Sequence, residues 1–218
     1  MQFYLVPRWF FGFDIALELL FAVITLLVSA YAFYMYKLSA ERHCKLLGFG
    51  FLSIAFSYIT WGILNFFLLT RLSDSSRVLV LEGLNLIGFF VLYGHIIFML
   101  LGLATLAYLT FRVRSYRVYS LFASLPLIMV LFSKHAALAF YFVSAVLLFY
   151  ITLHYFIKYS SIKRTTTLLV LIGFLFLFAG AVGFTLATLY HGSYVAGHLL
   201  QFLGYLFILL GFVKTVKS

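Results

Sequence analysis

The chain has 218 residues, of which 66% are hydrophobic, 21% aromatic and only 9% charged. A soluble domain of this size cannot bury so much apolar surface, so soluble enzymes, nucleic-acid binders and disulfide-stabilised scaffolds are excluded as main interpretations. The formal net charge of +10 is therefore interpreted as a topology signal and an attraction to anionic lipid headgroups, and we expect no nucleic-acid partner. The composition places the chain in a lipid bilayer.

Uncharged apolar stretches recur along the whole chain, and a transmembrane helix needs about 20 such residues. We predict an all-α integral membrane protein with one domain over residues 1–218. It is expected to be a bundle of seven transmembrane helices, at about 9–36, 46–70, 83–111, 118–133, 136–157, 165–190 and 194–213. The fourth is the shortest and contains Pro126, and we count it because the charge pattern requires seven crossings.

The basic residues are distributed unequally between the two sides that these seven helices define. Four fall on the side of the N-terminus: Arg8, Arg71, Arg77 and Lys134. Eleven fall on the opposite side: Lys37, Arg42, Lys45, Arg112, Arg114, Arg117, Lys158, Lys163, Arg164, Lys214 and Lys217. Because cytoplasmic loops carry an excess of Lys and Arg, we predict a multi-pass protein of the cell membrane with its N-terminus outside and its C-terminus in the cytoplasm.

Two pairs of helices resemble each other in sequence. Residues 49–52 (FGFL) match residues 172–175 (IGFL), and residues 94–97 (GHII) match residues 197–200 (GHLL), with Leu-Gly following each at 101–102 and 203–204. The pattern suggests a parallel repeat of three helices, a linker helix and three more. Chance similarity among helices rich in Leu, Phe and Gly is an equal alternative.

Polar residues inside a membrane are costly and usually face the protein interior. The first helix places Asp14, Glu18, Thr25 and Ser29 on one face. Two carboxylates one turn apart repel each other, so we expect one of them to hold a proton near neutral pH, or the pair to bind a cation. A carboxylate at a helix start is also favoured by the helix dipole, and this simpler interpretation suits Asp14 better than the deeper Glu18.

Histidines occur in the third and seventh helices, at His95 and His198, and Gln201 and Tyr205 share a stripe with His198. Membrane histidines can ligate haem or metal, can change charge near neutral pH, or can simply hydrogen-bond to another helix. Depth along the helices predicts an outward-facing polar pocket built from Glu18, Asn65, His95, His198 and Gln201. Asp14 and His191 are expected at its mouth.

Several catalytic motifs are absent from the sequence. It contains no H-E-x-x-H, no G-x-S-x-G and no lysine inside the seventh helix, which argues against zinc hydrolases, serine hydrolases and retinal chemistry. An enzyme is therefore not the expected class. On the second helix, Ser53, Ser57 and Thr60 form a stripe that we predict to hydrogen-bond across helices.

Residues 197–205 (GHLLQFLGY) and 50–58 (GFLSIAFSY) resemble the seven-helix membrane input regions that precede histidine kinases and cyclases in microbial sensors. The resemblance covers two helices. Unlike those sensors, this sequence is expected to carry no output domain. It implies a sensory, binding or interaction module that responds to a small ligand or a proton and signals through a membrane or cytoplasmic protein partner. The alternatives are a redox protein whose His95 and His198 ligate a b-type haem, and a small permease or channel.

Overall fold

The computed structural model describes residues 10, 12–72, 80–111, 115–187 and 192–217, and in these ranges all regular secondary structure is α-helix. Seven helices follow in the predicted order, which confirms the all-α fold. They are α1 (Phe13–Ser39), α2 (Arg42–Leu72), α3 (Val80–Thr110), α4 (Tyr116–Leu131), α5 (Ala136–Ile162), α6 (Thr165–Leu186) and α7 (Gly192–Lys217).

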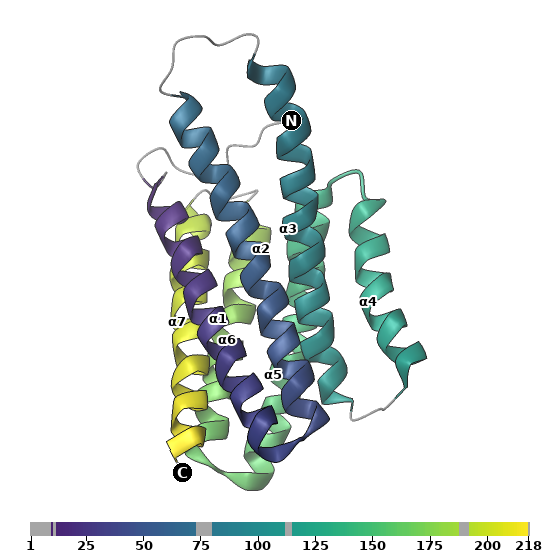
Figure 1. Ribbon diagram of the computed structural model, residues 1–218, viewed down its shortest axis with the longest axis vertical. Helices are drawn as coiled ribbons and strands as arrows, with labels where there is room; N and C mark the ends of the chain where they lie inside the picture. Colours follow the sequence, from purple (N-terminus) through teal and green to yellow (C-terminus); the bar gives the residue numbers. More distant parts are fainter. Residues whose placement is uncertain (1–9, 11, 73–79, 112–114, 188–191, 218) are drawn as a thin grey trace.

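Six of these helices, all except α4, are long and apolar enough to cross a membrane. The chain is therefore a polytopic membrane protein. With 16 residues, α4 is about 24 Å long, which is shorter than the roughly 30 Å of a bilayer's hydrocarbon core. It nevertheless runs opposite to α3 and α5, so it returns the chain to the end where α5 begins (Figure 1). The seventh crossing stays a prediction.

The six long helices form a closed ring, in which each packs against its two neighbours in the order α1, α2, α3, α5, α6, α7 and back to α1. Helix α4 lies outside this ring and packs only on α3 and α5 among the described elements (Figure 1). More than half of the surface of Leu121, Leu125 and Met129 is exposed on α4, as expected for a helix that faces lipid.

Glycines bring two pairs of neighbouring helices close together. A Cβ atom placed on Gly102 of α3 would lie 2.7 Å from the carbonyl oxygen of Gly50 on α2. A Cβ atom on Gly173 of α6 would lie 2.8 Å from the carbonyl oxygen of Gly204 on α7. Small residues at such crossings allow backbones to approach directly, so these glycines are structural. The parallel repeat stays a prediction.

The serine stripe on α2 joins this helix to α3. The hydroxyl of Ser53 donates to the carbonyl oxygen of Phe98 at 2.6 Å, and that of Ser57 donates to the carbonyl oxygen of His95 at 2.9 Å. Both bonds confirm the prediction of contacts across helices. For Thr60 the prediction was wrong, because its hydroxyl donates to the carbonyl oxygen of Ser57 in its own helix, as hydroxyls one turn apart commonly do.

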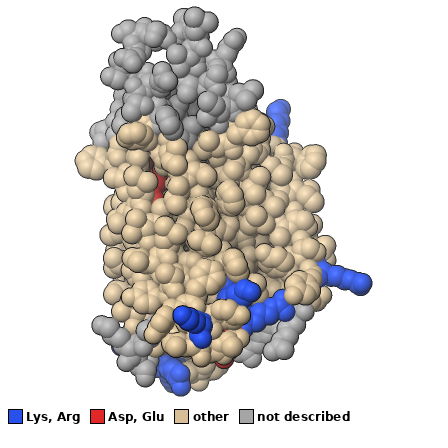
Figure 2. Space-filling model, in the orientation of Figure 1, with Lys and Arg blue, Asp and Glu red and all other residues tan. Residues whose placement is uncertain are grey.

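Basic side chains concentrate at one end of the bundle. On the face shown in Figure 2, most Lys and Arg lie near the lower end, where Figure 1 places the α1–α2 and α5–α6 connections and the C-terminus. Lys134 lies between α4 and α5, at the opposite end. Of the predicted charge pattern, Arg8, Arg77, Arg112 and Arg114 are outside the described residues. We call the lower end the basic end, and its cytoplasmic orientation stays a prediction.

Candidate functional site

All six helices of the ring contribute side chains to a cavity near its centre, which we call the central cavity. Of the predicted pocket residues, Glu18, His95, His198 and Gln201 line it, and they come from α1, α3 and α7. The volume that the centre of a water molecule can occupy inside the cavity is about 50 Å³. Because one water needs about 10–15 Å³ on this measure, the space suits a few waters or a small polar group.

Glu18 is the acidic group of the central cavity. Its side chain is only 3% exposed, and its Oε2 accepts a hydrogen bond of 3.0 Å from the Nδ2 of Asn65 on α2. Trp61, also on α2, lines the same cavity. The structure therefore places Asn65 beside Glu18, although Asn65 itself is not among the side chains that line the cavity.

Asp14 and His191 were predicted at the mouth of the pocket. Asp14 is buried in the first turn of α1, where its Oδ1 accepts bonds from the backbone N–H groups of Gly12 at 2.8 Å and Ile15 at 2.9 Å. It is not among the side chains that line the central cavity, and its bonds are those of a carboxylate at a helix start. His191 lies outside the described residues.

Each histidine of the central cavity is oriented by a backbone carbonyl. The Nδ1 of His95 lies 3.1 Å from the carbonyl oxygen of Ser57, and the Nδ1 of His198 lies 3.2 Å from that of Tyr194. A carbonyl oxygen can only accept, so we assign the proton to Nδ1 in both rings. In the neutral imidazole this leaves Nε2 as a hydrogen-bond acceptor.

A pair of tyrosine hydroxyls joins α2 to α7 at the same cavity. The hydroxyl oxygens of Tyr58 and Tyr205 lie 2.9 Å apart, and the Tyr58 hydroxyl also donates to Oε1 of Gln201 at 3.4 Å. Tyr205 and Gln201 belong to the same stripe of the seventh helix as His198, and all three side chains line the central cavity.

Aromatic rings form much of the remaining wall. Trp61 and Phe140 lie with their centroids 5.1 Å and 5.4 Å from that of His95, and Phe184 lies 4.9 Å from His198. Ser144 of α5 lines the same cavity, and its hydroxyl is buried without a hydrogen-bond partner among the described residues. Because such a group costs about 1–3 kcal/mol, it favours a polar occupant beside it.

Sequence reasoning missed several side chains of this site, chiefly Tyr58, Trp61 and Ser144. One signal for Trp61 was present, because Ser57, Trp61 and Asn65 are spaced four residues apart and must share one face of α2. With aromatic residues making up 21% of the chain, composition alone gave no reason to single out any of them.

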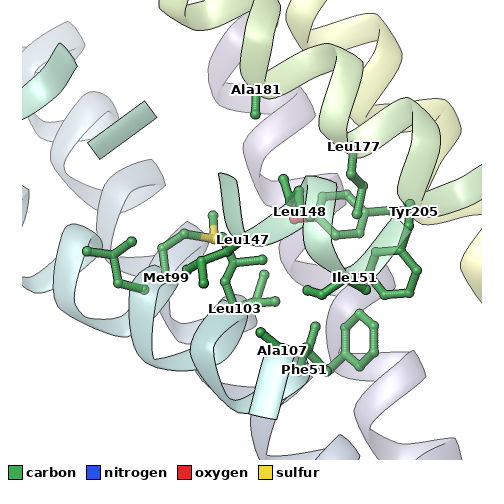
Figure 3. Packing of buried hydrophobic residues seen from close by; sticks show 14 of the residues in the cluster. Phe51, Met99, Leu103, Ala107, Leu147, Leu148, Ile151, Leu177, Ala181 and Tyr205 are labelled. Atoms are coloured by element: carbon green, nitrogen blue, oxygen red, sulfur yellow. The ribbon is translucent and has the colours of Figure 1, made fainter. Parts of the chain in front are cut away.

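A second cavity lies between α2, α3, α5 and α6, nearer the basic end, and we call it the lower cavity. The volume that the centre of a water molecule can occupy inside the lower cavity is about 200 Å³. On α5 and α6 the two cavities are one helical turn apart, since Leu148 and Leu177 line the central cavity and Ile151 and Phe174 line the lower one. Figure 3 shows the buried apolar side chains of this region, including Leu103, Leu148, Ile151 and Leu177.

The side chains between His95 and His198 do not fit a haem. The ring of Phe21 lies 6.2 Å from that of His198 and 5.3 Å from that of Tyr58, and Tyr58 lies 6.3 Å from His95. These rings occupy part of the region between the two histidines that a flat macrocycle would need. Within the described residues there is also no group of three or more His, Cys, Asp or Glu that could hold a metal ion.

No protein-family model, curated protein or solved structure matches the chain. The class of the protein therefore rests on its own fold and cavities. It is a polytopic α-helical membrane protein with six long helices in a ring, an acidic cavity at the centre and a second cavity toward the basic end.

Proposed function

We propose that the chain is a membrane-embedded binding module that takes a small, positively charged hydrogen-bond donor into the central cavity, with Glu18 as the group that recognises it. One observation carries this proposal. Glu18 is a buried carboxylate on a cavity whose described lining includes no lysine and no arginine. A buried charge is costly unless a partner compensates it, so a bound cation or a proton must do so.

The other walls of the cavity favour the same class of ligand. Nε2 of His95 and Nε2 of His198 are acceptors in the neutral rings, as described above. Aromatic faces such as those of Trp61 and Phe140 attract cations. An acceptor-rich, aromatic cavity of about 50 Å³ suits a small ammonium group, and a bare proton on Glu18 is the limiting case.

Occupation of the cavity is expected to change how the helices pack. Glu18 joins α1 to α2 through Asn65, and Tyr58 joins α2 to α7 through Tyr205. A ligand that competes for these hydrogen bonds favours whichever arrangement of the ring binds it better. In the sensory proposal, the connections at the basic end pass that change to a membrane or cytoplasmic protein partner.

Binding can be tested with the purified full-length protein in lipid nanodiscs, using methylammonium as the probe and methanol as its uncharged counterpart. We expect methylammonium, and not methanol, to raise the melting temperature in a saturable manner. Glu18→Gln should abolish this shift. Asp14→Asn is the matched control, because it removes a second buried carboxylate on the same helix whose partners are backbone N–H groups. Equal shifts in wild type and Glu18→Gln would refute the proposal.

A proton acting alone gives a different result in the same preparation. In that case methylammonium has no effect, while the melting temperature depends on pH in the wild type and loses part of that dependence in Glu18→Gln. A pH dependence that is identical in the wild type and Glu18→Gln, together with no response to methylammonium, would remove Glu18 from any binding role.

The permease alternative is favoured by one observation, the position of the lower cavity one helical turn from the central cavity. Apolar constrictions between wetted cavities gate several channels. Uptake of labelled methylammonium into proteoliposomes tests this directly. Flux that Glu18→Gln eliminates would favour a permease, whereas binding without flux would favour the sensory module.

A further inference from the structure

The lower cavity carries a chemistry opposite to that of the central cavity. It is lined by Lys158 and His154 of α5, by His43 at the start of α2 and by Thr110 at the end of α3. Its described lining includes no carboxylate. The amino group of Lys158 and the two imidazole rings can all donate hydrogen bonds to one occupant.

The placement of Lys158 is unusual for its residue type. Lysine side chains in proteins are mostly exposed, yet Lys158 is half-buried and lines a cavity between helices. Its amino group also lies 5.6 Å from the centroid of the Tyr155 ring, on the same wall. The cavity reaches the exposed His43, so it opens toward the basic end of the bundle.

We propose that the lower cavity is a phosphate-binding site in which Lys158, His154 and His43 hold the phosphate oxygens. A tetrahedral oxyanion presents acceptors in several directions, which suits donors that line one cavity from α2 and α5, and lysine is a common point-charge partner for phosphate. A space of about 200 Å³ accommodates such a group together with several waters.

The phosphate has two possible sources with the same chemistry. Basic pockets between transmembrane helices near the cytoplasmic surface bind the head groups of anionic lipids, and the lower cavity lies at the end of the bundle where Lys and Arg concentrate. A soluble phosphate from the adjacent aqueous phase would meet the same donors.

The test measures the melting temperature of the full-length protein in nanodiscs of two compositions. In zwitterionic phosphatidylcholine alone, potassium phosphate is compared with potassium chloride at equal ionic strength. In a second preparation, part of the phosphatidylcholine is replaced by phosphatidic acid. Lys158→Gln is the test variant, and Lys163→Gln is its control, because Lys163 is exposed just after α5 and does not line the cavity.

We expect Lys158→Gln to need about ten times more phosphate, or more, for the same stabilisation, as for the loss of a charge-assisted hydrogen bond. Lys163→Gln should match wild type. Stabilisation by potassium phosphate identifies a soluble anion, and stabilisation by phosphatidic acid alone identifies a lipid head group. No stabilisation from either source, or equal stabilisation of wild type and Lys158→Gln, would overturn the proposal. Glu18→Gln should retain phosphate binding, so this result is independent of the central cavity.

Discussion

The crossing of α2 and α3 at Gly102 makes a quantitative prediction about stability. In Gly102→Ala, the new methyl group would lie 2.7 Å from the carbonyl oxygen of Gly50 and 2.5 Å from the Cγ1 atom of Ile54. Ordinary contact begins near 3.4 Å, so the backbone of α2 must retreat by about 0.7 Å. The Ile54 side chain can change its rotamer, but the Gly50 carbonyl is backbone and cannot rotate away.

Overpacking of this kind costs about 1–3 kcal/mol, and the better helix propensity of alanine returns at most about 1 kcal/mol. Since the contact is with backbone, we place the cost at the upper end and expect the free energy of unfolding to fall by about 2 kcal/mol. Gly94→Ala on the same helix is the matched control, because nothing lies within 4 Å of its added methyl group. It should leave stability unchanged or raise it by up to about 1 kcal/mol.

Reversible unfolding in mixed detergent and dodecyl sulfate micelles, followed by circular dichroism, measures both variants. The reasoning fails if Gly102→Ala is as stable as wild type. It fails equally if Gly94→Ala loses as much stability as Gly102→Ala, since the loss would then come from alanine itself and not from the helix crossing.

Three further predictions use single substitutions or the natural sequence. Tyr58→Phe should lower the free energy of unfolding by about 1 kcal/mol because it removes one of two paired hydroxyls, whereas Tyr34→Phe on the exposed face of α1 should have no effect in the same unfolding assay. Ser57→Ala should cost about 1–2 kcal/mol because it removes a bond between α2 and α3, and Ser120→Ala, whose hydroxyl bonds only within α4, should be neutral; equal losses would contradict this. Cys44, the single cysteine, lies at the basic end, so an impermeant maleimide should label it in inside-out vesicles and not in intact cells; the reverse result would invert the predicted topology.

The helices could be predicted from sequence because each contains a long apolar run with few or no charges, bounded by charged or polar residues. Their arrangement could not, since apolar helices carry little information about which neighbours they choose. Helix α4 shows the difference. Its length and Pro126 marked it as atypical, yet its position outside the ring follows from contacts with α3 and α5 that no periodicity in residues 116–131 specifies.

The polar part of the central cavity was largely predictable, because intramembrane carboxylates and imidazoles face inward and depth along the helices brought Glu18, His95 and His198 to one level. Ser144 was not predictable. Hydroxyls in helices usually donate to their own backbone, as Thr152 does to the carbonyl oxygen of Leu148 at 2.7 Å. Only the three-dimensional structure shows that Ser144 differs and lines the cavity.

The glycine contacts at the α2–α3 and α6–α7 crossings can be compared with the predicted repeat. The sequence alignment pairs Gly50 with Gly173 and Gly102 with Gly204. In contacts, each of these glycines meets a branched side chain four residues after the glycine opposite. Gly50 meets Leu106 and Gly102 meets Ile54 at one crossing, and Gly173 meets Ile208 and Gly204 meets Leu177 at the other.

The two crossings therefore have the same contact pattern, and it fits the pairing of α2 with α6 and α3 with α7 as well as the pairing of α2 with α7 and α3 with α6. A duplication that preserves chain order is compatible with these contacts, and the parallel repeat stays a prediction. Close approach of two helices requires glycine on both, with a branched side chain one turn away to fill the groove beside it. Shared packing requirements thus suffice to explain why the glycine positions of the two helix pairs resemble each other.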